Sequence, residues 1–247
     1  MRLTMLLTIS AAARASRFLI MRHGETNHNA LGIIQGSSDD SRLTEQGLEQ
    51  ARAAGITLTG LTDISIDKVF VSPLTRAQQT LEMVDAAYSQ FFFSSLPKAT
   101  VISELREIDL GSWEGRDKQA LKAAEPDAYA AWQKEPLAFE IDGGVKPIVN
   151  LWARSSVAWE QMRAACTSDE RDADAVTLVV THNALGQALL CTALGLDETF
   201  FRTHEFANCA ALEVEWKNDA PRASGWRWRI GPKAPVGEVE GGPWLTS

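Results

Sequence analysis

The chain has 247 residues, of which 45% are hydrophobic and 23% charged, and a formal net charge of −8. This composition excludes a disordered or fibrous chain, and no stretch of about 20 apolar residues could span a membrane. The acidic charge argues against nucleic acid as a partner, because phosphate backbones require a basic face. The three cysteines are widely spaced without a CxxC pair, which indicates reduced thiols rather than a disulfide or zinc framework: Cys166, Cys191 and Cys209.

Both ends of the chain differ in composition from its middle. Residues 1–17 contain three arginines and no acidic residue, which is typical of a targeting peptide, whereas their short length is equally typical of a flexible N-terminus. Residues 231–247 are rich in glycine and proline and are predicted to form a disordered tail. A single domain is therefore expected over residues 18–230, without internal repeats.

An apolar run at residues 18–21 predicts the first strand, which ends at a polar sequence beginning with Arg22 and His23. Thr44 is the predicted N-cap of the helix that follows, because its hydroxyl can accept a hydrogen bond from the first helical turn. Small and apolar side chains recur at helical spacing after Thr44 and support this helix.

A second strand is predicted over residues 67–71 and leads directly into a second helix. Ser72 can cap this helix, and Pro73 suits its first position. Arg76 is therefore expected in the first helical turn, at the end of a strand.

The remaining elements continue the alternation of strands and helices. They are a strand at 99–103, an irregular and partly helical insert, a helix at 147–166, a buried strand at 175–180, a helix at 184–194 ended by Gly195, and a hairpin of strands at 209–216 and 226–230. This order predicts an α/β fold, a three-layer α/β/α sandwich with a mostly parallel sheet.

Polar residues follow three of the predicted strands. His23 follows the first strand, the turn from Ser72 to Arg76 follows the second, and His182 follows the strand at 175–180. Ligands bind outside the carboxyl ends of strands in such sheets. The three segments are therefore expected to meet at one site, although a lone histidine after a strand is more often structural than functional.

Four motifs in the same order resemble the histidine phosphatase superfamily, also called the phosphoglycerate mutase-like family. They are Arg22-His-Gly-Glu-Thr, Ser72-Pro-Leu-x-Arg76, Leu105-Arg-Glu107 with a following Gly-x-Trp-Glu-Gly, and Val-Thr-His182. The resemblance extends from about residue 18 to residue 216. It implies the phosphoglycerate mutase-like sandwich fold and an enzyme that acts on a small phosphorylated metabolite.

The resemblance implies that His23 is the nucleophile, which accepts the phosphoryl group and becomes phosphohistidine. A neutral imidazole is nucleophilic near pH 7, and its phosphoramidate is labile enough for water to cleave. Arg22 and Arg76 are implied to bind the phosphoryl oxygens, and His182 to be a further donor to them.

Glu107 corresponds to the proton donor of the family, which protonates the leaving oxygen and later takes a proton from the attacking water. Glu104 is the rival acid, but the family places the acid directly after Leu-Arg, so Glu104 is expected as a solvated surface side chain. Asn29 and Gln35 are expected as further phosphate or substrate contacts. This chemistry requires no metal and no cofactor.

The Gly111-x-Trp113 form of the acid motif resembles the phosphatase branch of the family, and the second half of the chain is similar to plant and algal 2-carboxy-D-arabinitol-1-phosphatase-like proteins. A metal-independent phosphatase of a small sugar phosphate or sugar-acid phosphate is therefore expected. The alternatives are a 2,3-bisphosphoglycerate-dependent phosphoglycerate mutase and an inactive phospholigand-binding protein. Val145 and Asn183 depart from the common family pattern and leave the substrate open. Location in the cytoplasm or a plastid, and assembly into a homo-oligomer, both remain open.

Overall fold

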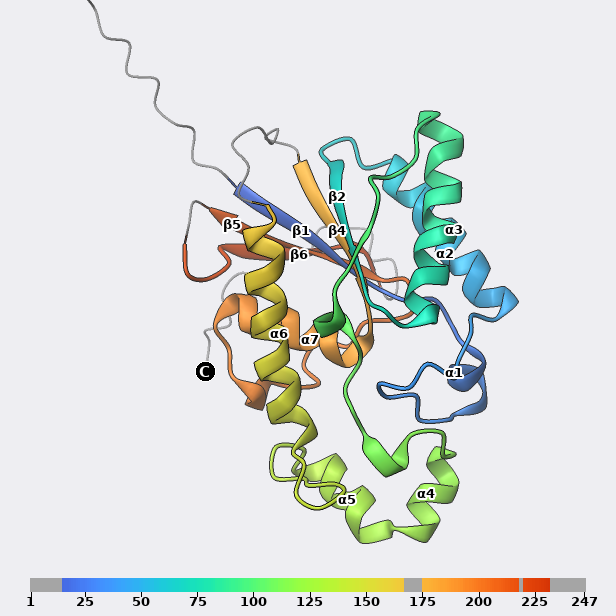
Figure 1. The fold of residues 1–247 in the computed structure, drawn as a ribbon, viewed down its shortest axis with the longest axis vertical. Helices are drawn as coiled ribbons and strands as arrows, with labels where there is room; N and C mark the ends of the chain where they lie inside the picture. The colour runs from blue at the N-terminus through green and yellow to red at the C-terminus, as the bar shows by residue number, and fades with distance from the viewer. Residues whose placement is uncertain (1–14, 167–174, 218–219, 232–247) are drawn as a thin grey trace, which may run out of the picture.

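The computed structural model describes residues 15–166, 175–217 and 220–231. A six-stranded sheet in the order β3-β2-β4-β1-β5-β6 forms the centre of these residues (Figure 1). Its strands are β1 (Ala15–Arg22), β2 (Ser65–Val71), β3 (Thr100–Val101), β4 (Ala175–Thr181), β5 (Ala211–Lys217) and β6 (Gly225–Ile230). The first four strands pair in parallel, and β5 and β6 are antiparallel additions, so the predicted mostly parallel sheet with a terminal hairpin is confirmed.

Helices cover both faces of the sheet in the part of the chain that is described. They are α1 (Asn27–Leu31), α2 (Glu45–Thr59), α3 (Thr75–Phe92), α4 (Lys118–Ala124), α5 (Pro126–Lys134), α6 (Pro147–Ala164) and α7 (Asn183–Leu194), with short 3₁₀ turns at Ser103–Leu105, Gly111–Trp113 and Glu198–Phe200. The pair α2 and α3 lies on one side of the sheet and the pair α6 and α7 on the other, whereas α1, α4 and α5 lie beyond the strand ends (Figure 1). The predicted three-layer α/β/α sandwich is thus confirmed.

The alternation of side chains along β1 produces the two cores. Phe18 and Ile20 belong to the apolar cluster that includes α6 and α7, and Leu19 and Met21 belong to the cluster under α2 and α3. All four side chains are completely buried. Burial of each contributes roughly 1.5–3 kcal/mol, so β1 is anchored from both faces and its carboxyl end is a rigid support for the residues that follow.

β1 begins at Ala15, three residues earlier than the predicted strand. Arg17 explains the difference, because its buried Nε donates to the carboxylate of Glu213 on β5 at 2.8 Å and its Nη1 donates to the carbonyl of Asp63 at 2.8 Å. Arg17 is therefore held inside the sheet, although composition alone assigned it to a flexible or targeting segment. Residues 1–14 and 232–247, the rest of the two predicted end segments, lie outside the described residues.

Thr44 caps α2 as predicted, with its side chain accepting from the amide of Gly47, and Gly195 ends α7 in the left-handed conformation at φ 74°. The predicted start of α3 was wrong by two residues, because the helix begins at Thr75 and its N-cap, Leu74, makes no side-chain cap hydrogen bond. The Ser72 hydroxyl is instead engaged at the candidate site. Arg76 still lies in the first turn.

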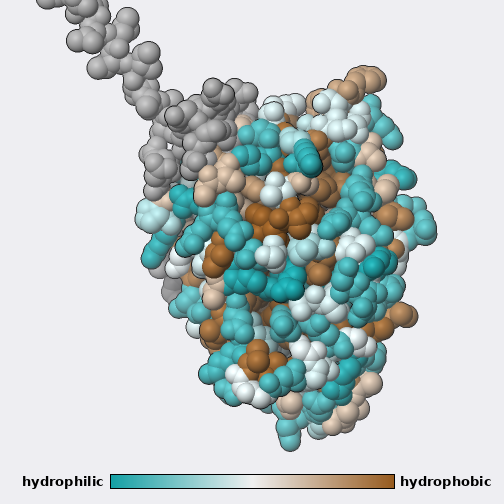
Figure 2. Space-filling view, in the orientation of Figure 1, coloured by the Kyte–Doolittle hydropathy of each residue, from teal (hydrophilic) through white to brown (hydrophobic). Residues whose placement is uncertain are grey.

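The three cysteines are buried and free, as expected of small apolar side chains in a reduced chain. Polar residues cover most of the molecular face shown in Figure 2, with a hydrophobic area near its middle. Among the described residues, none of the helices is both long and apolar enough for a membrane span.

Candidate active site

Three turns meet at the carboxyl ends of neighbouring parallel strands. The amide of His23 donates to the carbonyl of Thr181 at 2.9 Å, and the amide of Ser72 donates to the carbonyl of Val180 at 3.0 Å. These bonds continue the strand ladder beyond β1 and β2, so the residues after β1, β2 and β4 lie side by side. The convergence expected from the strand order is present in the structure.

The imidazole of His23 is held in one tautomer. Its Nδ1 lies 2.7 Å from the carbonyl oxygen of Gly24, which can only accept a hydrogen bond. Nδ1 therefore carries the proton, and Nε2 carries the lone pair. This is the tautomer that a nucleophilic histidine needs, and the protein sets it before any substrate arrives.

Gly24 is required for close packing of this turn. A Cβ at Gly24 would lie 2.5 Å from the carbonyl oxygen of Gly47 in the first turn of α2. The amide of Gly24 donates to the hydroxyl of Thr80 at 3.0 Å, and that hydroxyl donates to the carbonyl of Arg76 at 2.7 Å. The backbone around His23 is therefore locked to both α2 and α3.

His182 lies against His23, with their ring centroids 5.1 Å apart. Its Nδ1 accepts from Nε of Arg76 at 3.2 Å, so its Nε2 carries the proton and donates to the Ser72 hydroxyl at 2.8 Å. Both ring nitrogens are thus engaged within the protein. The sequence predicted His182 as a donor to phosphate, whereas in this structure it orients Arg76.

Arg76 is completely buried and has neutral partners. Its Nη1 donates to the carbonyl of Ser38 and its Nη2 to the carbonyl of Gly36, both at 2.8 Å. In the described parts of the chain no carboxylate forms a salt bridge with it. A buried guanidinium that is not paired with a carboxylate strongly attracts an anion.

Arg22 contributes a second guanidinium, on a side chain that is partly buried. Its Nη1 donates to the carbonyl of Phe206 at 2.6 Å, and its buried Nε has no hydrogen-bond partner among the residues that the structure describes. Asn183 supports this arrangement, because its side-chain oxygen accepts from the amide of Phe206 at 2.9 Å. Asn183, which departs from the family pattern, therefore anchors the segment that fixes Arg22.

Burial and the two arginines make both histidines neutral. Desolvation lowers the pKa of His23 well below 6.5, and the charges of Arg22 and Arg76 lower it further. Desolvation and Arg76 likewise lower the pKa of His182 well below 6.5. Burial also lowers the pKa of both arginines, but a guanidinium remains protonated at neutral pH. The site thus combines two neutral imidazoles with two positive charges.

Glu107 is held at the N-terminus of α7. Its Oε2 accepts from the amide of Ala184 at 3.1 Å, and its Oε1 accepts from the amides of Leu185 at 3.0 Å and Ile108 at 2.9 Å. Helix N-termini stabilise negative charge. Because α7 begins directly after His182, these bonds bring the carboxylate to the catalytic edge, where its charge raises the pKa of Arg22 and Arg76.

Glu104, the rival acid, lies elsewhere. It accepts from the hydroxyl of Ser103 at 2.7 Å and lines a surface groove next to α6. The geometry thus favours Glu107 over Glu104 as the acid of the site, in agreement with the family motif.

Asn29 and Gln35 lie in a hydrogen-bond network around Thr26. The side-chain oxygen of Asn29 accepts from the amide of Thr26 at 3.2 Å, which completes the N-terminal cap of α1. The side-chain oxygen of Gln35 accepts from the hydroxyls of Thr26 at 2.9 Å and Ser41 at 2.6 Å. Both side-chain oxygens therefore accept hydrogen bonds from protein groups. A ligand would be bound by the amide NH₂ groups of these two side chains.

Arg154 of α6 contacts the candidate acid, although no role was predicted for it from the sequence. Its Nη2 donates to the carbonyl of Glu107 at 2.8 Å, so it holds the backbone of the candidate acid. In the sequence it stands out only as part of Leu151-Trp152-x-Arg154, one of the segments that resemble the 2-carboxy-D-arabinitol-1-phosphatase-like proteins. Among the described residues, no cluster of three or more His, Cys, Asp or Glu side chains could hold a metal ion.

The neutral histidines predict a specific pH dependence of stability. An unfolded chain protonates its histidines below about pH 6.5, whereas folded His23 and His182 resist protonation, so the unfolding free energy falls as the pH drops through this range. Each can contribute up to about 1.4 kcal/mol per pH unit. Denaturant unfolding between pH 7 and 5 should therefore show a shallower pH dependence for His182→Asn than for the unaltered chain. Parallel curves would contradict the assignment of neutral buried histidines.

Comparison with known proteins agrees with this geometry. Residues 18–229 match the model of the histidine phosphatase superfamily (branch 1). The chain is 38% identical over 204 residues, 83% of its length, to 2-carboxy-D-arabinitol-1-phosphatase of Triticum aestivum, and it spans 38% of the length of that relative. It is 30% identical to a protein of Erwinia tasmaniensis named as a probable phosphoglycerate mutase, GpmB, with 84% of this chain and 88% of that protein covered.

Comparison of the fold with solved structures also finds a phosphatase. A solved structure of mycobacterial glucosyl-3-phosphoglycerate phosphatase superimposes with a TM-score of 0.69 at 26% identity, covering 90% of this chain and all of that one. The family assigned from the sequence motifs is confirmed by the match over most of the chain. The protein belongs to the histidine phosphatase superfamily, branch 1.

Proposed function

We propose that this protein is a metal-independent phosphatase that hydrolyses a small sugar phosphate or sugar-acid phosphate through a phosphohistidine intermediate. The observation that carries the proposal is the tautomer of His23, whose Nε2 holds the lone pair of a ring on which the charges of Arg22 and Arg76 act. A phosphate dianion can pair with these two guanidinium groups, because among the described residues neither of them forms a salt bridge with a carboxylate. The family membership supports the same chemistry.

In the first step, Nε2 of His23 attacks phosphorus, a P–N bond forms and the bond from phosphorus to the ester oxygen breaks. The Glu107 carboxyl group protonates the leaving oxygen, so a neutral alcohol departs. Arg22 and Arg76 stabilise the charge on the equatorial oxygens of the transferring group. The Gly24 carbonyl keeps the Nδ1 proton in place and stabilises the cationic ring that forms.

In the second step, water attacks the phosphohistidine. The Glu107 carboxylate takes a proton from the water, the P–N bond breaks, and Nε2 regains its lone pair as inorganic phosphate forms. Glu107 donates a proton in the first step and accepts one in the second. Its position near the two arginines therefore matters for both steps.

The proposed substrate class is supported by the wheat relative, which is named for a sugar-acid phosphate. A phosphate-release screen over sugar phosphates, sugar-acid phosphates and phosphoglycerates tests the proposal. Hydrolysis of at least one class, with phosphate transiently bound to the protein in an alkaline quench that preserves phosphohistidine, is expected. Absence of phosphate release from every ester, including p-nitrophenyl phosphate, would refute it.

Glu107→Gln tests the proton donor. The amide cannot protonate the leaving oxygen, so alkyl phosphates should be hydrolysed roughly 10²–10⁴ times more slowly. p-Nitrophenyl phosphate should lose much less, because its leaving group needs little protonation. The readout is the ratio of kcat/KM for the two kinds of ester. Glu49→Gln, which removes an exposed carboxylate from α2, is the matched control and should leave this ratio unchanged. Equal losses for both esters would contradict the role of Glu107.

Similarity to the Erwinia protein supports a second candidate, a phosphoglycerate mutase. Both activities begin with the same phosphohistidine and differ in whether water or a second substrate hydroxyl accepts the phosphoryl group. Incubation with 3-phosphoglycerate separates them. Inorganic phosphate is the expected product of the phosphatase, and 2-phosphoglycerate would identify a mutase.

A further inference from the structure

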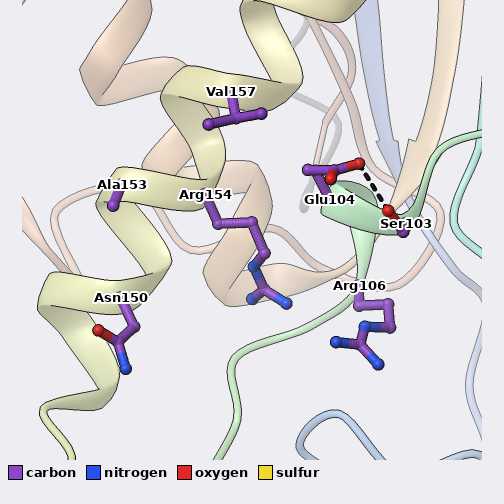
Figure 3. A pocket seen from close by; sticks show the side chains of 7 residues that line it. All are labelled: Ser103, Glu104, Arg106, Asn150, Ala153, Arg154 and Val157. Atoms are coloured by element: carbon purple, nitrogen blue, oxygen red, sulfur yellow. Dashed lines mark hydrogen bonds between the residues drawn. The ribbon is translucent and has the colours of Figure 1, made fainter.

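A groove of about 410 Å³ opens between α6 and the segment that leads to Glu107. Arg154 and Asn150 line it from α6, and Ser103, Glu104 and Arg106 line it from the facing segment (Figure 3). The guanidinium groups of Arg106 and Arg154 both extend into the space between the two walls (Figure 3).

The residues that line this groove carry more positive than negative charge. Arg106 and Arg154 bring two positive charges. Burial lowers the pKa of Arg154 and the charge of Arg106 lowers it further, whereas Glu107, Asp109 and Glu104 act in the opposite direction. Glu104 is the acidic side chain among the residues that line the groove, and it accepts a hydrogen bond from Ser103. The space between the two arginines therefore favours a bound anion, which would relieve the repulsion between them.

The groove is coupled to the candidate active site through Arg154. One of its nitrogens donates to the Glu107 carbonyl, and burial is the main cause of its lowered pKa. The charge of Arg154 also contributes to the lowered pKa of His182. A group bound by Arg154 in the groove would thus lie next to the segment that carries the proposed proton donor.

We propose that the groove is a second anion site, in which Arg106 and Arg154 bind a carboxylate or a phosphate group. Two sources share this chemistry. The anion is either the acidic group of the substrate itself, whose phosphate lies at His23, or a separate small organic acid. The first source rests on the proposed phosphatase function and would explain a preference for sugar-acid phosphates.

Two esters that differ only in the acidic group test the first source. 3-Phosphoglycerate has a carboxylate where glycerol 3-phosphate has a hydroxymethyl group. Loss of one charged hydrogen-bonding partner corresponds to about tenfold, so Arg106→Gln should lower the ratio of kcat/KM for 3-phosphoglycerate over glycerol 3-phosphate by about tenfold. Glu104→Gln removes the opposing charge and should raise the ratio. Arg52→Gln, which removes an exposed positive charge from α2, is the matched control and should leave it unchanged.

The second arm uses D-glycerate, which has the carboxylate but no phosphate, and follows the thermal unfolding midpoint. Arg106→Gln can leave the ratio of kcat/KM unchanged while D-glycerate raises the thermal unfolding midpoint of the unaltered protein but not that of Arg106→Gln. In that case the groove binds a separate acid and not the acidic group of the substrate. If neither the ratio nor the glycerate response depends on Arg106, the groove proposal is overturned. If no phosphate ester is hydrolysed at all, the proposed function fails, and the glycerate arm still decides the groove.

Discussion

His23→Ala is expected to lower phosphate release by roughly 10⁴-fold or more, because it removes the Nε2 lone pair of the ring on which the charges of Arg22 and Arg76 act. The fold should persist. The side chain makes one hydrogen bond, to the Gly24 carbonyl at the end of β1, so the unfolding free energy should change by about 1 kcal/mol or less. Steady-state hydrolysis and denaturant unfolding measure the two effects separately.

His204→Ala is the matched control, because His204 is a half-buried histidine outside the strand ends of the site and should be replaceable without loss of activity. In the alkaline quench, labelled phosphate should stay on the unaltered protein and on His204→Ala but not on His23→Ala. Phosphate release at the normal rate by His23→Ala would refute the nucleophile and, with it, the proposed mechanism.

Arg76→Lys is expected to lower kcat/KM by roughly 10²–10³-fold, although the charge is retained. The guanidinium binds the carbonyls of Gly36 and Ser38 and Nδ1 of His182 at the same time, and a single ammonium cannot span these three acceptors. The loop that contains Gly36 and Ser38 would lose these two hydrogen bonds to α3 and keep those between Asp39 and Thr75. His182 would lose the donor that fixes its tautomer.

Phosphate binding gives this prediction a second readout. A ligand that binds the folded state raises the unfolding midpoint, and the rise grows with the logarithm of the ratio of ligand concentration to Kd. Inorganic phosphate should therefore stabilise the unaltered chain and Arg52→Lys, but Arg76→Lys much less. An equal response to phosphate in Arg76→Lys would show that this guanidinium is not part of the anion site, even if the activity had fallen for structural reasons.

The sequence by itself determined the elements whose signals are local. The apolar run at 18–21, the hydroxyl of Thr44 and the glycine at 195 each act within a few residues, and the structure has the strand, the cap and the helix end that they predict. The order of strands also placed His23 and His182 at one edge, because the carboxyl ends of parallel strands meet there. Those inferences needed no knowledge of packing.

Tertiary structure alone decided how the side chains of that edge share their hydrogen bonds. Ser72 illustrates the limit. Its hydroxyl accepts from the nearby amide of Leu74 at 3.3 Å, but it also binds a histidine 110 positions away, which no local pattern predicts. The same holds for the Arg17–Glu213 pair and for Arg154 on the carbonyl of Glu107. A hydrogen bond between distant segments depends on where loops bring their carbonyls, and neither side-chain periodicity nor local propensity encodes that position.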